Sequence, residues 1–344
     1  MRVLLLSILL LPFSMVAQIK YNSEAKKLYN KGIKELKDGN ETAALDFFTK
    51  CVDKDKRYAE AYLNMSAIYL GQEKHDKALN SAKNAYSQNK FQPAVYSQLG
   101  KCYFENMMYD SATFFLNKGL LMGDNSASNF IYLGRSHYEN ENFEASLEIF
   151  DKAIQMDNSN AGIYNARGKT KFQLADYGGA EADFTRAQEL NPDTPRLLLN
   201  LANCSVAQEK YESAQNQINN GINKVSEADR LQLLILQGNL YLKQDSLSLA
   251  VETFEEALKL DQSNATILNN QAAVLLEMED YESAITKCNK ALEIQGEMME
   301  AYFNRGIANE MLRNIEDACA DWEQAFILGS EKAEEFLNSA TCNE

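Results

Sequence analysis

The sequence predicts an all-α solenoid of about nine helix pairs with a C-terminal capping helix. Residues 128–158 hold two amphipathic segments whose apolar side chains recur every three or four residues, which is typical of helices. Helices this short are marginal alone and need neighbours. Small residues recur every 34 residues, and only four prolines occur in 344 residues. Length alone would suggest two or three domains, but a stack of repeats is one quasi-linear unit.

Three series of small residues define the repeat. The first series, which contains two extra residues before its seventh member, is Gly32, Ser66, Gly100, Gly134, Gly168, Ala202, Gly238, Ala272 and Gly306. Further small residues follow each of them, from Ala44 and Cys51 in the first copy to Ala318 and Ala325 in the last. Small side chains at these points let two helices approach to about 8–10 Å. Bulky residues fill the intervals, at Phe48, Leu116, Phe150, Phe184, Ile218, Phe254 and Trp322.

This arrangement resembles the tetratricopeptide repeat family, whose pattern is W-x2-L-G-x2-Y…A-x3-F…P. The fifth copy has Tyr164, Gly168, Tyr177, Ala180, Phe184, Ala187 and Pro192 at signature positions. The resemblance covers residue 25 to about residue 332, and it implies a right-handed α-solenoid with a concave groove. Repeats are expected to start near residues 25, 59, 93, 127, 161, 195, 231, 265 and 299, followed by a cap over 331–342. We expect the two extra residues, near residues 222–230, to form a local bulge in a loop.

Residues 1–17 are typical of a secretory signal peptide. Arg2 precedes an apolar stretch from Val3 to Leu11, and Ala17 offers a small residue for cleavage. The alternative is a buried N-terminal helix. Because the apolar run is too short to span a bilayer comfortably, we expect an exported solenoid of residues 18–344, periplasmic or extracellular. The resemblance is to exported bacterial members of the tetratricopeptide repeat family, and it implies the periplasm of a Gram-negative bacterium as the setting.

The net charge of −15 narrows the class of partner. An acidic protein repels nucleic-acid backbones and anionic lipid heads. The sequence therefore predicts a protein or peptide partner, no nucleic acid, and no integral membrane segment after signal cleavage.

Six cysteines raise the question of disulfides in an exported chain. Four of them fall in non-adjacent repeats, so we expect buried thiols at Cys51, Cys102, Cys204 and Cys288. Cys319 and Cys342 differ, because they flank a turn near Gly329 between two antiparallel helices and lie at similar heights. Exported chains of this family often end in the same way. A bridge between the two and a pair of independent thiols both remain open.

No catalytic or metal-binding constellation occurs in the sequence. It lacks a Gly-rich phosphate loop, G-x-S-x-G, H-E-x-x-H and a cysteine pair with zinc spacing. Both histidines, His75 and His137, fall at packing positions, where we expect satisfied imidazoles. The sequence therefore predicts a protein that is not an enzyme and has no cofactor.

The resemblance places the groove on the first helix of each repeat, at its places 2, 5, 9 and 12 or 13. Family members that clamp a C-terminal carboxylate carry Lys at the fifth place. None of the fifth places is basic here: Tyr29, Leu63, Ser97, Ile131, Asn165, Leu199, Ile235, Asn269 and Phe303. This departure argues against a cochaperone of the carboxylate-clamp type.

The ninth places form a polar ladder of three cations and two amides: Lys101, Arg135, Lys169, Asn203 and Asn239. Arg196, Asn165 and Asn200 are expected nearby. Arg can bind a carboxylate in bidentate fashion, and Asn can pair with a peptide backbone. The ladder therefore predicts a ligand groove for a partner with acidic groups. The alternative is a polar open face whose cations pair with acids of the same chain.

The predicted function is that of a non-enzymatic adaptor or scaffold that binds a partner segment in its groove. Two alternatives remain, a chaperone-like assembly factor for envelope proteins and an accessory subunit of an exported enzyme complex. A holdase would suppress the aggregation of many unfolded clients, whereas an adaptor would capture one or two partners.

Overall fold

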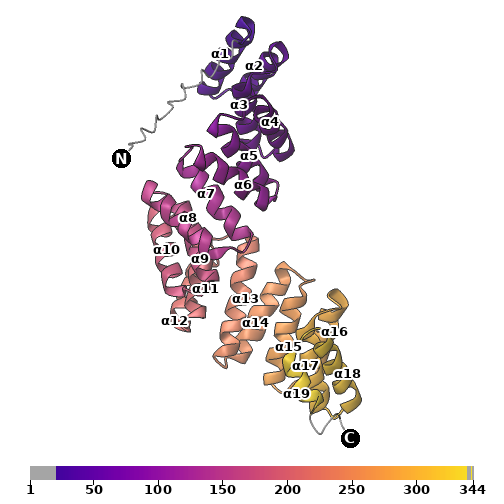
Figure 1. Ribbon diagram of the computed structural model, residues 1–344. Helices are drawn as coiled ribbons and strands as arrows, with labels where there is room; N and C mark the ends of the chain where they lie inside the picture. Colours follow the sequence, from indigo (N-terminus) through magenta and orange to yellow (C-terminus); the bar gives the residue numbers. More distant parts are fainter. Residues whose placement is uncertain (1–20, 339–341, 343–344) are drawn as a thin grey trace, which may run out of the picture. The chain divides into compact units, whose positions relative to one another are not determined.

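The computed structural model describes residues 21–338 and Cys342, and the regular secondary structure of these residues is entirely α-helical (Figure 1). The predicted signal peptide lies outside the described residues. The described part of the chain forms two compact units, which divide after Asp157. The first unit contains α1 (Ser23–Lys37), α2 (Glu41–Lys54), α3 (Ala59–Gly71), α4 (His75–Gln88), α5 (Pro93–Glu105), α6 (Tyr109–Leu121), α7 (Ala127–Glu139) and α8 (Phe143–Met156).

The second unit contains eleven helices in its described part. They are α9 (Ala161–Gln173), α10 (Tyr177–Leu190), α11 (Arg196–Ala207), α12 (Tyr211–Gly221), α13 (Glu227–Lys243), α14 (Leu247–Leu260), α15 (Ala265–Glu277), α16 (Tyr281–Ile294), α17 (Met299–Met311), α18 (Ile315–Ile327) and α19 (Glu331–Leu337). The sequence predicted one solenoid over 18–344. The division falls at a repeat boundary, where a chain held by nearest-neighbour contacts can separate into units.

Within each unit, helices pack against their neighbours in sequence, and first helices also pack against each other. The helix pairs α3–α5 and α5–α7 make such contacts in the first unit, as do α11–α13, α13–α15 and α15–α17 in the second. One face of each unit is therefore built from consecutive first helices. This is the solenoid arrangement that the 34-residue period predicts.

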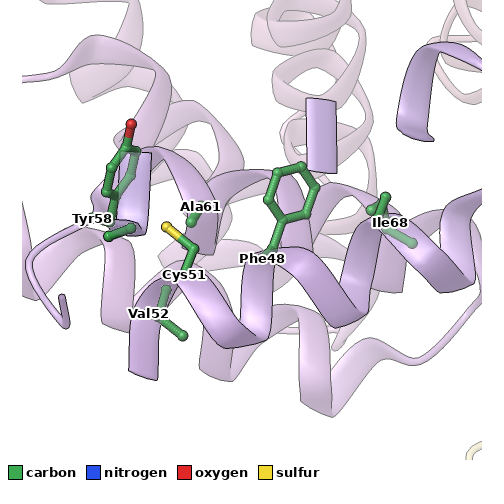
Figure 2. Close-up of a cluster of buried hydrophobic side chains, with 8 residues drawn as sticks. Phe48, Cys51, Val52, Tyr58, Ala61 and Ile68 are labelled. Carbon is green, nitrogen blue, oxygen red and sulfur yellow. The ribbon is translucent and has the colours of Figure 1, made fainter. Parts of the chain in front are cut away.

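The glycines recur because, in several repeats, an aromatic ring from the second helix packs directly against the glycine of the first helix. A Cβ atom added at Gly32 would lie 2.6 Å from Cε1 of Phe48, and one at Gly134 would lie 2.8 Å from Cε1 of Phe150. Phe48 is fully buried, and Figure 2 shows it in a cluster with Cys51, Val52, Tyr58, Ala61 and Ile68. Small residues are thus required because an aromatic ring occupies the space a side chain would need.

The turn inside most repeats is closed by a residue in the left-handed conformation. Eight non-glycine residues have positive φ there, namely Glu73, Met107, Glu141, Ala175, Glu209, Asp245, Glu279 and Arg313. The next amide then reaches back over the helix end, as when the N–H of Lys74 donates to the carbonyl of Tyr69 at 2.9 Å. This satisfies the last carbonyls of the first helix.

The two extra residues before the seventh repeat lengthen a helix and do not form the predicted bulge. The helix α13 begins at Glu227, four residues before the expected start at Leu231, and is 17 residues long. The side chain of Ser226 accepts a hydrogen bond from the N–H of Asp229 at 3.2 Å. This N-cap makes an early helix start favourable, so the insertion is absorbed by helix.

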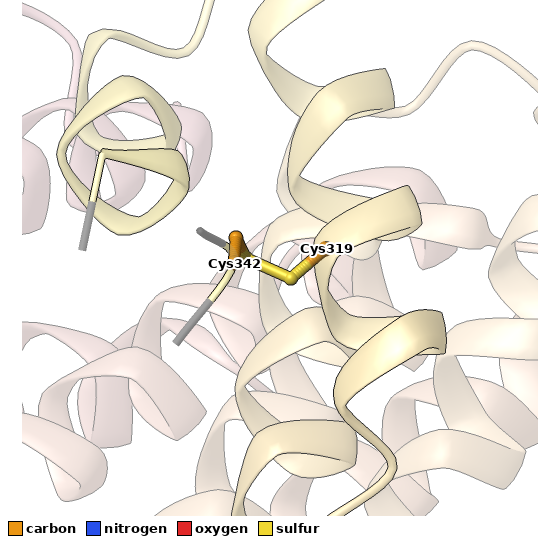
Figure 3. Close-up of a disulfide and its surroundings, with 2 residues drawn as sticks. All are labelled: Cys319 and Cys342. Atoms are coloured by element: carbon orange, nitrogen blue, oxygen red, sulfur yellow. A yellow bond between two sulfur atoms is a disulfide. The ribbon is translucent and has the colours of Figure 1, made fainter. Parts of the chain in front are cut away.

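The structure buries the four isolated cysteines as free thiols, which confirms that prediction. Burial raises the pKa of Cys51 and of Cys102 to about 11. Cys319 on α18 and Cys342 are joined in a disulfide, with their α-carbons 5.8 Å apart (Figure 3). Of the two arrangements that the sequence left open, this is the bridged one.

Asp55 ties the start of the first repeat to the loop that follows this repeat. Its buried carboxylate accepts a hydrogen bond from the backbone N–H of Asn22 at 2.9 Å and two from the Arg57 guanidinium at 2.9 Å. The hydrogen bonds from Arg57 hold the pKa of Asp55 well below its usual range, although burial opposes them. The charged carboxylate therefore stabilises the folded chain above the unfolded pKa of about 4.

Replacing Asp55 with Asn should lower the thermal midpoint at neutral pH, because the amide cannot accept the same charged hydrogen bonds. A lowered folded pKa means that this stabilisation is lost as the pH falls below about 4. Thermal unfolding of both proteins followed by circular dichroism from pH 7 to pH 2 checks this. The midpoints should converge at low pH; a constant difference would contradict the role of the charge.

Candidate binding surface

Two of the predicted groove residues meet in the first unit on the face built from first helices. Lys101 lies on α5 and Arg135 on α7, one repeat apart. The guanidinium carbon of Arg135 is 4.4 Å from the ring centre of Phe104 and 5.8 Å from that of Tyr132. The Nζ atom of Lys101 is 5.9 Å from the Tyr132 ring centre. We call these four residues the cation–aromatic cluster.

The electrostatics of the cation–aromatic cluster follow from its partial burial. Burial and the neighbouring Glu105 carboxylate raise the pKa of Tyr132 to about 12, so its ring is neutral at pH 7. Burial lowers the pKa of Lys101, while the Asp124 carboxylate acts in the opposite direction. The guanidinium of Arg135 is exposed. The cluster thus presents an exposed guanidinium close to two aromatic rings.

Amide side chains link consecutive repeats in the second unit. Nδ2 of Asn200 donates to Oδ1 of Asn165 at 3.1 Å, which brings two predicted groove residues together. Asn239 instead accepts from Nδ2 of Asn270 at 3.0 Å, and Asn270 was not among the predicted residues. Each bond joins the first helices of adjacent repeats. These amides therefore stabilise the stack as well as offering polar groups on its face.

The remaining predicted residues are not gathered into one site. Arg196 on α11 forms an ion pair with Asp229 at 3.4 Å, which is the own-chain pairing considered as an alternative. Lys169 is exposed on α9, and Asn203 is partly buried on α11. Lys101 and Arg135 belong to the first unit and Lys169 to the second. The three-cation ladder is therefore two separate pieces, each described within its own unit.

Sequence reasoning missed a buried ion cluster on α9 and α10. The carboxylate of Asp183 is nearly buried and accepts hydrogen bonds from Arg167 Nε at 2.8 Å and Nη2 at 2.6 Å. Lys171 Nζ lies 2.9 Å from the same carboxylate. The last full repeat repeats the arrangement with Arg305 and Asp321. The signal was present, because a cation precedes an Asp by 16 residues in both repeats.

No metal-binding chemistry is seen in the described part of the chain. Among residues 21–338 and Cys342, no group of three His, Cys, Asp or Glu side chains could hold a metal ion. His75 and His137 are partly buried, as packing positions should be, but their Nδ1 atoms have no hydrogen-bond partner. The prediction of satisfied imidazoles is wrong in that respect. Burial lowers the pKa of His137, which favours its neutral form.

No helix in the described part of the chain combines the length and apolar character needed to cross a bilayer.

Two family profiles, both described as tetratricopeptide repeat, match residues 171–237 and 235–298. The tetratricopeptide repeat protein 36 homolog of Drosophila melanogaster is 37% identical over 105 residues, covering 28% of this chain and 56% of that protein. The DnaJ homolog subfamily C member 7 homolog of Dictyostelium discoideum is 32% identical over 102 residues, covering 28% of this chain and 19% of that protein. The chain thus spans less than two thirds of the length of these curated relatives.

Solved structures share the fold. The chain is similar to a tetratricopeptide repeat protein from Parabacteroides merdae, with a TM-score of 0.52 and 16% identity over 74% of this chain and 100% of that one. It is also similar to a chain of the APC/C hetero-tetramer Cut9-Hcn1, with a TM-score of 0.57 and 13% identity over 92% and 64%. At such identities the likeness concerns the fold, and it confirms the predicted all-α repeat architecture.

Proposed function

We propose that this chain, whose residues 171–237 and 235–298 match tetratricopeptide repeat models, is a non-enzymatic scaffold that binds segments of a partner protein on the faces built from its first helices. Proteins built from such repeats typically mediate protein–protein interactions through these surfaces. The observation that carries the proposal is the cation–aromatic cluster, where Arg135 is exposed yet held against Phe104 and Tyr132. A pre-oriented guanidinium loses little freedom when it binds a carboxylate.

The partner segment is proposed to carry acidic groups opposite the cation–aromatic cluster. The partly buried amides of Asn165 and Asn200 would pair with the backbone of an extended segment in the second unit. Partner chemistry of this kind fits a protein and not a nucleic acid, whose phosphates the net charge of −15 repels.

We place the scaffold in an exported, periplasmic or extracellular setting. The apolar stretch after Arg2 supports this, since it is typical of a secretory signal. The Cys319–Cys342 disulfide supports it too, because disulfides persist in oxidising compartments. An assembly factor for envelope proteins or an accessory enzyme subunit would use the same surface with a different partner.

Reversing three cations tests the proposed surface. The variant Lys101→Glu/Arg135→Glu/Lys169→Glu should remain folded, because Arg135 and Lys169 are exposed and Lys101 is only partly buried. Circular dichroism checks this. The variant should retain at most about a tenth of the specific partner that residues 18–344 capture from an envelope extract, because charge-assisted contacts are replaced by repulsion. Quantitative mass spectrometry of the captured proteins measures this.

The matched control makes the same charge change on second helices. Lys118, Lys259 and Lys290 are exposed on α6, α14 and α16, and their reversal to Glu alters the net charge equally. Capture should persist in this control. Equal capture by both variants, or equal loss in both, would rule out the first-helix cations as the binding site.

A further inference from the structure

The charge of the chain is divided very unequally between the two units. Residues 1–157 contain 19 basic residues (Lys and Arg) and 19 acidic residues (Asp and Glu). Residues 158–344 contain 15 basic and 30 acidic residues. The acidic excess is concentrated further toward the C-terminus, where residues 251–344 contain 6 basic and 20 acidic residues. The second unit therefore attracts cationic partners, whereas the cations of the first-helix ladder point to an acidic one.

A pocket in the second unit opens between α15, α17 and the start of α19, and we call it the cap pocket. Its apolar wall is formed by Phe303 and Met299, and its rim carries the carboxylates of Glu300 and Glu331. Both glutamates are exposed. Lys332 also lines the rim and leaves it with one net negative charge, to which the surrounding acidic repeats add.

The wall of the cap pocket is held in place by the capping helix. The Phe303 and Phe336 rings pack at 87° with their centres 5.4 Å apart, and the Phe336 ring centre lies 4.7 Å from that of the buried Trp322. On the other side, Nδ2 of Asn304 donates to Oδ1 of Asn269 at 2.9 Å. The pocket is thus pre-formed between two repeats and the cap, which lowers the cost of binding.

We propose that the cap pocket binds a Lys or Arg side chain from an extended, basic segment of a partner protein. The aliphatic part of such a side chain would pack along Phe303 and Met299, as amphipathic side chains do. Its cation would lie between Glu300 and Glu331 and close to the face of Phe303. The inference rests on the proposed scaffold function, and adds to it a second contact of opposite charge.

The test uses the full chain and a labelled, acetylated and amidated dodecapeptide in which Arg alternates with Ala. Fluorescence anisotropy is measured at about 0.15 M salt, where the Debye length is about 8 Å and distant charges are screened. A matched peptide with citrulline in place of Arg keeps the shape and removes the charge. The Arg peptide should bind at least about tenfold more tightly, as charge-assisted bonds require.

Two variants with the same charge change locate the site. Glu300→Gln/Glu331→Gln should weaken binding of the Arg peptide about tenfold. The control Glu252→Gln/Glu293→Gln removes two exposed carboxylates from the second helices α14 and α16, and should change the affinity less than about twofold. Phe303→Leu keeps the wall apolar and should weaken binding about threefold through the lost ring face.

Three results would overturn the cap pocket proposal. The first is equal weakening by both glutamine pairs, which would indicate a diffuse acidic field. The second is equal affinity for the Arg and citrulline peptides. The third is the absence of any binding of the Arg peptide. The triple reversal of Lys101, Arg135 and Lys169 should leave this peptide bound. A negative peptide-binding result would therefore not affect the proposal on the first-helix cations. A negative capture result would not affect the cap pocket proposal.

Discussion

Replacing Asp183 with Ala is expected to destabilise the second unit by about 3–5 kcal/mol, because it leaves two cations without their buried counter-ion. Asp183 is 4% exposed, and the side chains of Arg167 and Lys171 are 19% and 17% exposed. Both cations are therefore largely shielded from water. The loss should appear as a lower denaturation midpoint measured by circular dichroism.

The matched control is an ion pair of similar length on the surface. Lys50 and Asp46 lie 2.6 Å apart on α2, and both side chains are more than half exposed. Asp46→Ala should cost less than about 1 kcal/mol, since water replaces the lost partner. Similar costs for the two alanine variants would show that the α9–α10 cluster is not the desolvated network we describe.

The repeat period could be predicted because one packing contact recurs in copy after copy. Gly134 faces Phe150, Gly168 faces Phe184 and Gly238 faces Phe254, so that each pair imposes the same spacing on the sequence. Six of the nine described first helices begin at the expected residue for this reason, among them α3 at Ala59 and α15 at Ala265. Helix ends were less predictable, since Ser226 supplies a cap that starts α13 early.

Only part of the candidate site could be predicted from the sequence. The places of Lys101 and Arg135 followed from the family resemblance, but their contacts depend on rings in other turns. Phe104 approaches Arg135 from the preceding repeat, and Tyr132 lies one turn before Arg135 on the same helix. Whether a cation is paired also depends on which acid the next helix presents, as Asp229 does for Arg196. Such pairings follow from tertiary packing.

The Cys319–Cys342 disulfide is expected to hold the capping helix against the end of the second unit. The helix α19 has only seven residues, of which Ala333 is fully buried, and Phe336 packs on Trp322. Such a short helix is marginal alone, and the ends of a repeat stack open first. A bridge across 23 residues contributes about 3 kcal/mol in the chain-entropy model.

The double variant Cys319→Ser/Cys342→Ser should therefore expose the backbone amides of α19 to exchange about 100-fold faster. Cys288→Ser, which alters a buried free thiol of α16, is the control for changing a cysteine without removing a bridge. It should leave exchange in α19 unchanged. Hydrogen exchange followed by mass spectrometry resolves both.

The same instrument decides whether the bridge exists in the protein from its native compartment. Peptides digested without reductant should contain Cys319 linked to Cys342, and reduction should accelerate exchange in α19 as the double variant does. If both cysteines are alkylated without reduction, the bridge is absent. The cap, and with it the wall of the cap pocket, would then depend on the packing of Ala333, Phe336 and Leu337.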